Sequence, residues 1–299
     1  MEKLTGLIVK AISGFYYIEA ADVLYECKAR GVFRKKGITP AVGDRAEITV
    51  LDDGTAAVDA ILPRKNSLVR PPLANLDRLF IVASVSEPSP STLIIDKISA
   101  VAVEKGIEPV IVFTKSDLAD CDELLSIYRS AGIRAMSYSI HSHQDKQELT
   151  ALLEGKISAF TGNTGVGKSS LLNSLFPELE IETAEISKKL GRGRHTTRHS
   201  ELYKVGRGYV ADTPGFSTVD IERYEVIMGD EIAYCFPEFR EYLTQCRFST
   251  CTHTCEKGCA VLDAVSAGKI PVSRHNSYKA MYDEVKNIPA WEMKKRQSN

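Results

Sequence analysis

Residues 162–169 constrain the fold of this 299-residue chain more than any other segment. They read Gly-Asn-Thr-Gly-Val-Gly-Lys-Ser and match the phosphate-loop pattern G-x-x-x-x-G-K-[ST] at every fixed position. In such a loop, backbone N–H groups surround the phosphates of a nucleotide, Lys168 adds a point charge, and the Ser169 hydroxyl binds Mg²⁺. An apolar strand pattern before the loop and a helical pattern to Phe176 after it support this interpretation. The residues that we expect to contact the nucleotide here are Gly162, Asn163, Thr164, Gly165, Val166, Gly167, Lys168, Ser169 and Ser170.

A tetrapeptide that could read a guanine base comes before the phosphate loop. Thr114-Lys115-Ser116-Asp117 follows a near-continuous apolar run, and open α/β sheets bind ligands where such buried strands end. Asp117 would accept hydrogen bonds from the guanine N1–H and exocyclic amine, which adenine cannot reproduce, and the Lys115 stem would lie over the base. Thr114 stands where many GTPases have Asn, but its hydroxyl can still brace the phosphate loop. The alternative interpretation is a surface turn.

The order of these motifs is unusual. Asp212-Thr213-Pro214-Gly215 follows the phosphate loop, as the metal-side carboxylate (Asp212) and the γ-phosphate-sensing turn (Gly215) should. The base-reading tetrapeptide at 114–117, however, comes before the phosphate loop instead of after it. This order indicates a circularly permuted GTPase domain. From Leu79 onwards, strand and helix patterns alternate as in the second half of a Ras-like GTPase followed by its first half, which predicts a parallel sheet with helices on both sides. The expected strands are 79–85, 109–113, 133–139 and 156–161, and the expected helices are 92–105, 120–131, 145–153 and 169–176. The last guanine-side loop should lie near residues 137–139.

A glycine-rich basic segment lies between the phosphate loop and Asp212. Residues 191–199 read Gly-Arg-Gly-Arg-His-Thr-Thr-Arg-His and suit a switch that orders around the γ-phosphate and Mg²⁺, with Thr197 or Thr196 as the second hydroxyl ligand of the ion. A solvated loop that contacts only rRNA phosphates is the alternative, and both uses could coexist.

The residue that orients the attacking water in Ras has no counterpart at the matching position of this chain. Ras places a Gln just after the Asp-x-x-Gly turn, whereas this chain has Phe216, which cannot polarise water. His195 in the switch segment is our candidate catalytic residue, and an exposed or merely phosphate-contacting histidine is the alternative. We therefore expect slow intrinsic turnover and activation by a partner.

The first part of the chain has a different pattern. Residues 1–67 contain five short β-rich runs separated by turns, which predict a small closed barrel of the OB type, a common oligonucleotide-binding scaffold. Arg30, Arg34, Lys35 and Lys36 gather basic charge in one loop that either binds RNA or is simply solvated. With a boundary near Arg70-Pro71-Pro72, the expected domains are a barrel at 1–67, the permuted GTPase domain at 68–222 and a mostly helical zinc-binding domain at 223–299.

A cluster of cysteines marks the last domain. Cys246-x₄-Cys251-x-His253-x₅-Cys259 holds three thiols and one imidazole, the ligand types of a structural tetrahedral Zn²⁺ site. Cys255 is a fifth candidate, so spacing alone leaves the ligand set open. The odd total of seven cysteines, with no signal-peptide pattern at the N-terminus, argues for thiols and metal over a disulfide framework. Free buried cysteines are the alternative.

Composition limits the function classes. An apolar content of 43%, a charged content of 26% and no long apolar run fit a cytoplasmic monomer without a membrane segment. A net charge of −1 excludes bulk basicity as the route to nucleic acid, so RNA binding must use local patches. Asp117 and Lys115 argue against an ATPase or a small-molecule kinase. Phe216 gives some support to an RNA-binding scaffold whose nucleotide site is only structural.

The combination of permuted motifs, N-terminal barrel and C-terminal cysteine cluster closely resembles the ribosome small-subunit-dependent GTPase A family of bacteria. The resemblance includes Gly-Arg-His-Thr-Thr at 193–197, Asp-Thr-Pro-Gly-Phe at 212–216 and Phe-Pro-Glu-Phe at 236–239. It implies a late maturation factor that binds the small ribosomal subunit and its rRNA, hydrolyses GTP to GDP and phosphate when engaged, and then leaves. It also implies catalysis by His195 and assigns zinc to Cys246, Cys251, His253 and Cys259, leaving Cys255 out.

Overall fold

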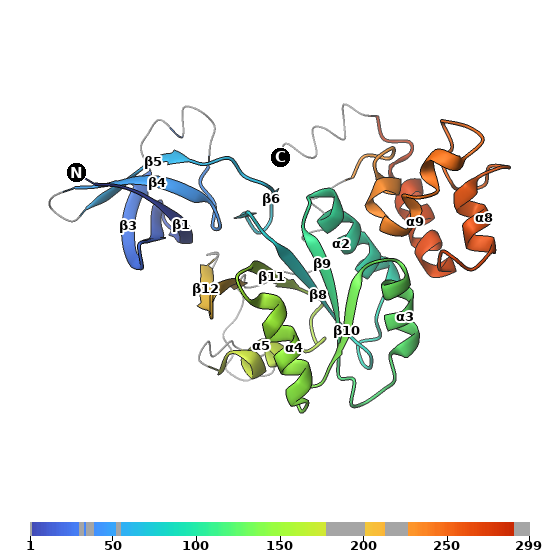
Figure 1. Ribbon diagram of the computed structural model, residues 1–299, viewed down its shortest axis with the longest axis horizontal. Coiled ribbons are helices and arrows are strands. Elements are labelled where there is room, and N and C mark those ends of the chain that lie inside the picture. Colours follow the sequence, from blue (N-terminus) through green and yellow to red (C-terminus); the bar gives the residue numbers. More distant parts are fainter. Residues whose placement is uncertain are drawn as a thin grey trace. The chain divides into compact units, whose positions relative to one another are not determined.

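The computed structural model describes residues 2–29, 33, 39–51, 55–177, 201–212 and 227–289. The chain forms two compact units (Figure 1). Their segments are Met1–Arg78, Thr150–Phe160 and Arg192–Phe216 in the first unit, and Leu79–Leu149, Thr161–Gly191 and Ser217–Asn299 in the second. Among the described residues, no helix combines the length and the apolar character that a bilayer crossing needs. The basic-loop residues Arg30, Arg34, Lys35 and Lys36 lie outside the described residues.

The first unit contains a closed barrel of five strands. β1 (Glu2–Ile12) is antiparallel to β2 (Phe15–Ala20), and β2 is antiparallel to β3 (Val23–Ala29). β3 runs parallel to β5 (Ala56–Ile61), which is antiparallel to β4 (Arg45–Val50), and β4 returns to the first half of β1. Closure of the ring removes open strand edges and confirms the barrel that the sequence predicts. Apolar side chains fill its interior, among them Ile8, Ile18, Cys27, Ile48 and Val58.

One glycine lets the barrel pack against the segment that follows it. Gly43 has a φ of +91°, and a Cβ at this position would stand 2.1 Å from the Ala74 carbonyl oxygen, so no larger residue fits. The neighbouring Asp44 is fully buried, and its carboxylate accepts a hydrogen bond of 2.6 Å from Arg64 Nε. Barrel and following segment are thereby joined within the first unit. That segment contains the antiparallel pair β6 (Ser67–Leu68) and β7 (Leu73–Ala74).

Three further strands belong to the first unit. β11 (Ile157–Thr161) is parallel to β13 (Gly208–Asp212), and β13 is antiparallel to β12 (Glu201–Val205). β12 pairs with β1 of the barrel, and Lys10 and Glu201 are the partner residues in this pairing. Their side chains also form an ion pair, with 2.8 Å between Lys10 Nζ and Glu201 Oε2. The strand that feeds the phosphate loop therefore lies beside the strand that ends at Asp212, as a GTPase sheet requires.

The second unit alternates strands with helices (Figure 1). Its strands lie in the order β10-β9-β8, with β9 and β10 parallel, and β9 is buried from Pro109 to Thr114 because both of its faces are covered. The strands are β8 (Arg78–Ser84), β9 (Glu108–Thr114) and β10 (Arg134–Tyr138). The helices are α2 (Thr92–Glu104), α3 (Asp122–Ser130), α4 (His143–Leu153) and α5 (Lys168–Leu175). This pattern confirms the α/β architecture expected of a permuted GTPase domain.

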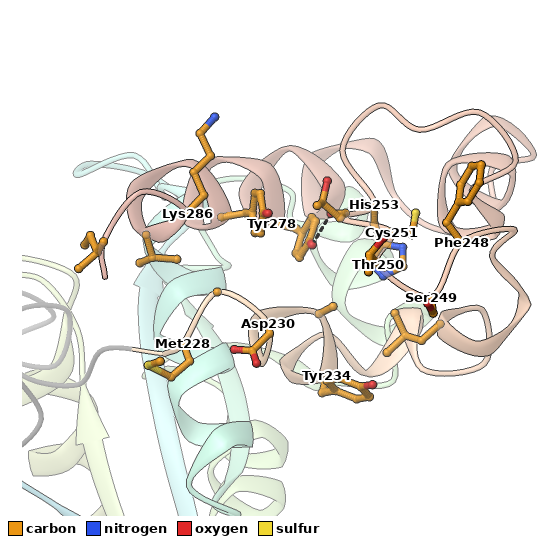
Figure 2. Close-up of a pocket in the computed structure, with 17 residues that line it drawn as sticks. Met228, Asp230, Tyr234, Phe248, Ser249, Thr250, Cys251, His253, Tyr278 and Lys286 are labelled. Atoms are coloured by element: carbon orange, nitrogen blue, oxygen red, sulfur yellow. Dashed lines mark hydrogen bonds between the residues drawn. The ribbon is translucent and has the colours of Figure 1, made fainter. Parts of the chain in front are cut away.

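Short helices surround the cysteine cluster in the last part of the second unit. α8 (Ala260–Ser266) and α9 (Val272–Val285) are separated where Gly268 adopts a φ of +70° and Pro271 precedes the first turn of α9. The 3₁₀ helices are η2 (Ile232–Cys235), η3 (Pro237–Phe239) and η4 (Leu243–Gln245). Figure 2 shows a cavity between α9, η2 and the loop at 248–252.

A buried arginine joins α9 to the helices of the α/β part. Arg274 is 1% exposed and donates to Asp96 of α2 at 2.6 Å and to both carboxylate oxygens of Glu238 at 2.6 and 3.2 Å. Its guanidinium also lies over the ring of Phe236, with 4.5 Å from Cζ to the ring centroid. Burial would lower the pKa of Arg274, but the charges of Asp96 and Glu238 outweigh burial and raise it. The guanidinium of Arg274 is therefore held in its charged form next to both carboxylates.

Candidate nucleotide site and metal centre

The phosphate loop is a strand-to-helix turn that only glycine permits at two points. Gly162 directly follows β11, and a Cβ there would stand 2.5 Å from the Val82 carbonyl oxygen of β8. Gly167 has a φ of +90° and precedes α5, whose first residue is Lys168. The N-terminus of α5, which is the positive end of the helix dipole, lies where the motif would place the phosphates. Ser169 and Ser170 are in the first turn of this helix.

The base-reading tetrapeptide contacts this loop directly. Thr114 is buried at the end of β9, and its hydroxyl donates its one proton to the carbonyl oxygen of Val166, with the carbonyl oxygen of Ala83 3.2 Å away as a second possible acceptor. Lys115 has a left-handed φ of +62°, and its ammonium donates to the carbonyl oxygens of Gly165 at 3.1 Å and of Glu87. The hydroxyl brace expected of Thr114 is therefore present in the structure.

Asp117 extends from the same strand end. It is exposed, and no described residue forms an ion pair or hydrogen bond with its carboxylate. The backbone of the tetrapeptide is held independently, because Leu118 N–H donates to the Lys115 carbonyl oxygen at 2.9 Å and Ser116 N–H to that of Tyr138 at 3.4 Å. The structure thus leaves the acceptor oxygens of Asp117 available to a base.

The loop after β10 contains residues that the sequence analysis did not single out. Ser139 N–H donates to the Asp145 carboxylate at 2.8 Å, and Asp145 N–H donates to the Ser142 hydroxyl at 3.2 Å. The two bonds cap α4, and the Ser-x-x-Asp spacing at 142–145 is the sequence signal that could have found them. The guanine-side loop was expected near residues 137–139; Ser137 and Tyr138 belong to β10, and the loop begins at Ser139.

His195, Thr196, Thr197, Gly215 and Phe216 lie outside the described residues. The backbone of Asp212 ends β13, one residue beyond the Ala159–Ala211 pair with β11, but its side chain is not among those described. The catalytic and switch assignments stay predictions.

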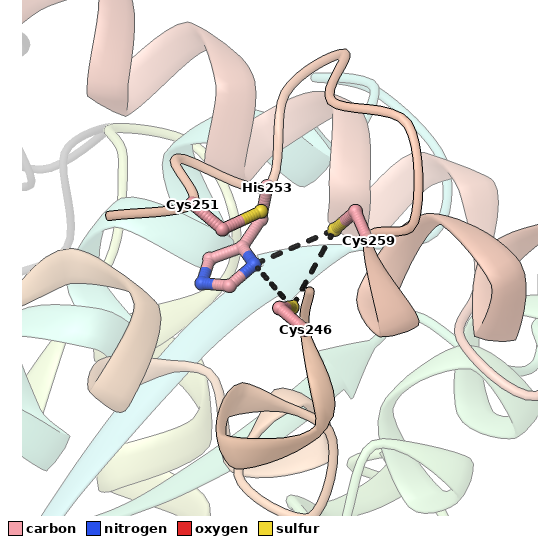
Figure 3. Close-up of side chains that lie close together, drawn as sticks. All are labelled: Cys246, Cys251, His253 and Cys259. Carbon is pink, nitrogen blue, oxygen red and sulfur yellow. Dashed lines mark hydrogen bonds between the residues drawn. The ribbon is translucent and has the colours of Figure 1, made fainter. Parts of the chain in front are cut away.

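The cysteine cluster forms a metal-binding geometry (Figure 3). The ligand atoms of Cys246, Cys251, His253 and Cys259 all lie within 4.8 Å of one another. Cys246 and Cys259 sulfurs are 3.9 Å apart, and each is 3.5 Å from His253 Nδ1. Tetrahedral Zn²⁺ with bonds of about 2.3 Å to sulfur and 2.0 Å to nitrogen would separate its ligand atoms by roughly 3.5–3.8 Å. Cys255 is exposed and is not part of this group. The spacing of the five candidates in the sequence left the ligand set open, and the geometry selects these four residues.

Burial shifts the pKa values of two of these ligands. Burial lowers the pKa of His253, so its ring is neutral and can coordinate through nitrogen. Burial raises the pKa of Cys251 to about 12, so the thiolate needs a positive charge close by. A divalent cation among the four ligands would supply that charge.

Residues around the cluster hold the ligand loop. His275 Nε2 lies 2.8 Å from the His253 carbonyl oxygen, and Tyr278 donates its hydroxyl proton to the Thr252 carbonyl oxygen at 2.6 Å. Glu256 accepts hydrogen bonds from the N–H groups of Thr252 and Thr254 at 2.7 and 3.0 Å. Such second contacts orient ligands in metal sites. His275 and Glu256 use their side chains to hold the ligand loop, which fits a structural metal.

Family models match most of the chain. The model described as "RsgA GTPase" matches residues 61–222, and the model described as "RsgA N-terminal domain" matches residues 5–58. The chain belongs to the RsgA family of GTPases. An RsgA member from Shouchella clausii, named small ribosomal subunit biogenesis GTPase RsgA, is 42% identical over 288 residues, which cover 94% of this chain and 97% of the relative. RsgA 2 of Oceanobacillus iheyensis, with the same description, is 44% identical over 286 residues and equal coverage.

Solved RsgA-like structures share the fold. YjeQ from Thermotoga maritima is 35% identical, with a TM-score of 0.83 over 96% of this chain and all of that one. YloQ, described as a circularly permuted GTPase, is 32% identical, with a TM-score of 0.79 over 96% of both chains. These similarities confirm the motif order read from the sequence as a circular permutation, and they make the chain an RsgA-type GTP hydrolase.

Proposed function

We propose that this RsgA family member binds the small ribosomal subunit and its rRNA, assists late maturation of that subunit, and hydrolyses GTP to GDP and phosphate when the subunit stimulates it. The observation that carries the GTP part is the hydrogen bonding of Thr114 and Lys115 to the phosphate loop, which unites base reading and phosphate binding. The names of the 42–44% identical relatives support the ribosomal part. The proposed protein is a cytoplasmic monomer with a barrel at 1–67, a GTPase domain at 68–222 and a zinc domain at 223–299.

Each proposed role in the nucleotide site follows from chemistry. Asp117 reads the guanine edge, Lys115 covers the base, and the loop from Gly162 to Ser170 surrounds the phosphates. Mg²⁺, held through Ser169 and Thr197 with Asp212 on its outer side, would neutralise charge on the phosphates, and Gly215 would sense the γ-phosphate. His195 would orient the attacking water, because Phe216 cannot.

The metal of the cysteine cluster is proposed to be one structural Zn²⁺. Three sulfurs and one nitrogen at tetrahedral spacing are the ligands that Zn²⁺ prefers, and the set has no open position for a substrate. The metal would hold the loop from Cys246 to Cys259 in its fold.

The decisive experiment measures GTP hydrolysis by the purified full chain alone, with small ribosomal subunits, and with large subunits as a control. Strong stimulation by small subunits alone would support the proposal. Equal turnover in all three reactions would contradict it. In the same assay, His195→Ala should keep GTP affinity and lose most of the stimulated turnover, and normal stimulated turnover would remove His195 from its proposed role.

A further inference from the structure

Tyr138 joins the end of β10 to the helix that follows the phosphate loop. It is the last residue of β10, its side chain is fully buried, and its hydroxyl forms a hydrogen bond with the Ser174 hydroxyl in the last turn of α5. The Ser174 hydroxyl donates its own proton to the Leu171 carbonyl oxygen at 2.8 Å, so its oxygen is left to accept from Tyr138. Burial raises the pKa of Tyr138, and the phenol therefore keeps the proton that it donates.

The backbone of the same tyrosine contacts the base-reading side of the site. In the parallel pairing of β9 and β10, Tyr138 is the register partner of Thr114. The Tyr138 carbonyl oxygen accepts the Ser116 N–H at 3.4 Å, and the loop expected on the guanine side begins directly after it. Tyr138 is thus tied through its backbone to the tetrapeptide at 114–117 and through its side chain to α5.

Two register partners therefore hold the two ends of the phosphate-binding segment. The Thr114 hydroxyl bonds to the Val166 carbonyl oxygen just before α5. The Tyr138 hydroxyl bonds to Ser174 near the other end of the helix, and this second bond is named the clamp below. Ser174 lies six positions after Lys168, which a rise of about 1.5 Å per residue converts to roughly 9 Å along the helix axis. The bond at Val166 alone would let the helix pivot about that point, whereas the clamp fixes its direction.

The direction of α5 matters because the helix begins with the residues that the motif assigns to the phosphates. A change in direction re-aims the N–H groups of its first turn and the side chains of Lys168 and Ser169 relative to Asp117. A nucleotide is one covalent unit, so it satisfies its phosphate and base contacts together only if the two sets of protein groups keep the right separation. Such groups need to be held within roughly 0.5 Å of their productive positions.

We propose that Tyr138 is a positioning residue for guanine nucleotides, which acts through Ser174 to set the direction of α5 relative to the base-reading tetrapeptide. The inference rests on the proposed function, in which Asp117 reads the base and α5 binds the phosphates. A tyrosine suits this position because its buried ring ends in a hydroxyl that makes one directional bond. The clamp makes tight phosphate binding at α5 depend on a correct fit of the base, and this favours guanine nucleotides over other triphosphates.

Nucleotide affinities of the full chain test the proposal. Equilibrium titration with Mg²⁺ compares GTP with inosine triphosphate, whose base lacks the exocyclic amine that Asp117 would accept. Tyr138→Phe removes only the hydroxyl, and GTP affinity should fall roughly fivefold, because α5 loses a restraint worth one neutral hydrogen bond and is correctly aligned less often. Affinity for inosine triphosphate should fall by less than about twofold, since a ligand with fewer base contacts gains less from their alignment. Discrimination between the two nucleotides should therefore shrink.

Two further variants separate the clamp from general effects of mutation. Ser174→Ala removes the other half of the bond at a half-buried position and should give the same two changes in affinity. The double variant should bind GTP no more weakly than either single variant, because all three lack the same bond. Tyr128→Phe removes a buried hydroxyl from α3 and is the matched control, which should bind both nucleotides like the parent. Circular dichroism and thermal melting establish that each variant is folded.

Several results would overturn the inference. A folded Ser174→Ala variant that binds GTP like the parent would show that the clamp does not position α5. Equal losses for GTP and inosine triphosphate would give the pair a structural role only, and additive losses in the double variant would show that the two residues act separately. A parent that binds both nucleotides equally would contradict the base-reading role of Asp117 and the clamp with it. A discriminating parent whose Tyr138→Phe variant discriminates to the same extent would contradict the clamp alone.

Discussion

The Thr114 hydroxyl donates a hydrogen bond to the carbonyl oxygen of Val166, 52 positions later in the chain. This bond links the end of the base-reading strand to the middle of the phosphate loop. In an unpermuted GTPase the corresponding elements come in the reverse order, yet the contact is available because the packed strand ends, and not the chain order, bring the two loops together. A threonine is sufficient for the brace, since only one donor is used.

Replacing this threonine tests the link. Thr114→Val keeps the shape but removes the donor, which leaves the Val166 carbonyl oxygen without this partner. We expect GTP affinity to fall roughly fivefold, as the loss of one neutral hydrogen bond of about 1 kcal/mol predicts. Equilibrium titration with a fluorescent GTP analogue measures the change. Thr114→Ser, which retains the hydroxyl, is the control, and equal losses in both variants would show that the bond is not responsible.

Metal analysis tests the ligand set. The purified, untagged chain should contain one zinc per molecule by elemental analysis, because four ligand atoms lie within 4.8 Å of one another. Cys259→Ser should lose most of this zinc and melt at a lower temperature, since binding of a structural metal contributes directly to folding. Cys255→Ser should retain the full amount. Loss of zinc in the Cys255 variant would contradict the geometry.

Glu256 should make stability depend on pH. Burial alone would raise its pKa, but hydrogen bonds from the Thr252 side chain and from neighbouring backbone N–H groups outweigh burial and lower the pKa to about 2. A carboxyl group with a depressed folded-state pKa stabilises the fold above its unfolded pKa, near 4.5, and this contribution is lost as the pH falls towards the folded value. The melting-temperature difference between the parent and Glu256→Gln should therefore be constant from pH 7 to about 5 and shrink below that. A difference that is independent of pH down to 3 would show that the charge is unimportant.

The buried Arg274 should be required for stability. Arg274→Met leaves Asp96 and Glu238 inside the protein without their counter-charge, and removing one partner of such a buried group costs about 3–5 kcal/mol. Chemical denaturation measures the free energy of unfolding. The triple variant with Asp96→Asn and Glu238→Gln added should recover part of the loss, because no unpaired charge remains. A triple variant that is less stable than the single one would contradict this account.

Periodicity and motif spacing were enough to predict most of the fold. The helix expected at 92–105 is α2, Thr92–Glu104, because Ser91 caps its N-terminus and apolar residues recur on its buried face. Such features are local, so the sequence carries them in neighbouring residues.

Contacts between distant residues were not readable in the same way. Arg274 and Asp96 are polar residues in helical patterns, and each would be assigned to a solvated face unless its partner were known. The choice between Cys255 and the four ligands likewise depends on the direction of each side chain, which cysteine spacing does not encode. Non-local pairing is a property of the packed chain, and a single sequence gives no signal for it.

The ion pair between Asp96 and Arg274 spans 178 positions, and this has a consequence for the newborn protein. During synthesis, α2 leaves the ribosome long before the residue that neutralises its carboxylate has been translated. A lone carboxylate cannot be enclosed in an apolar interior without a large cost, so the second unit can close only when α9 arrives. An incomplete chain would remain loosely packed and open to proteases. The buried triad thus makes closure of the second unit depend on the synthesis of α9.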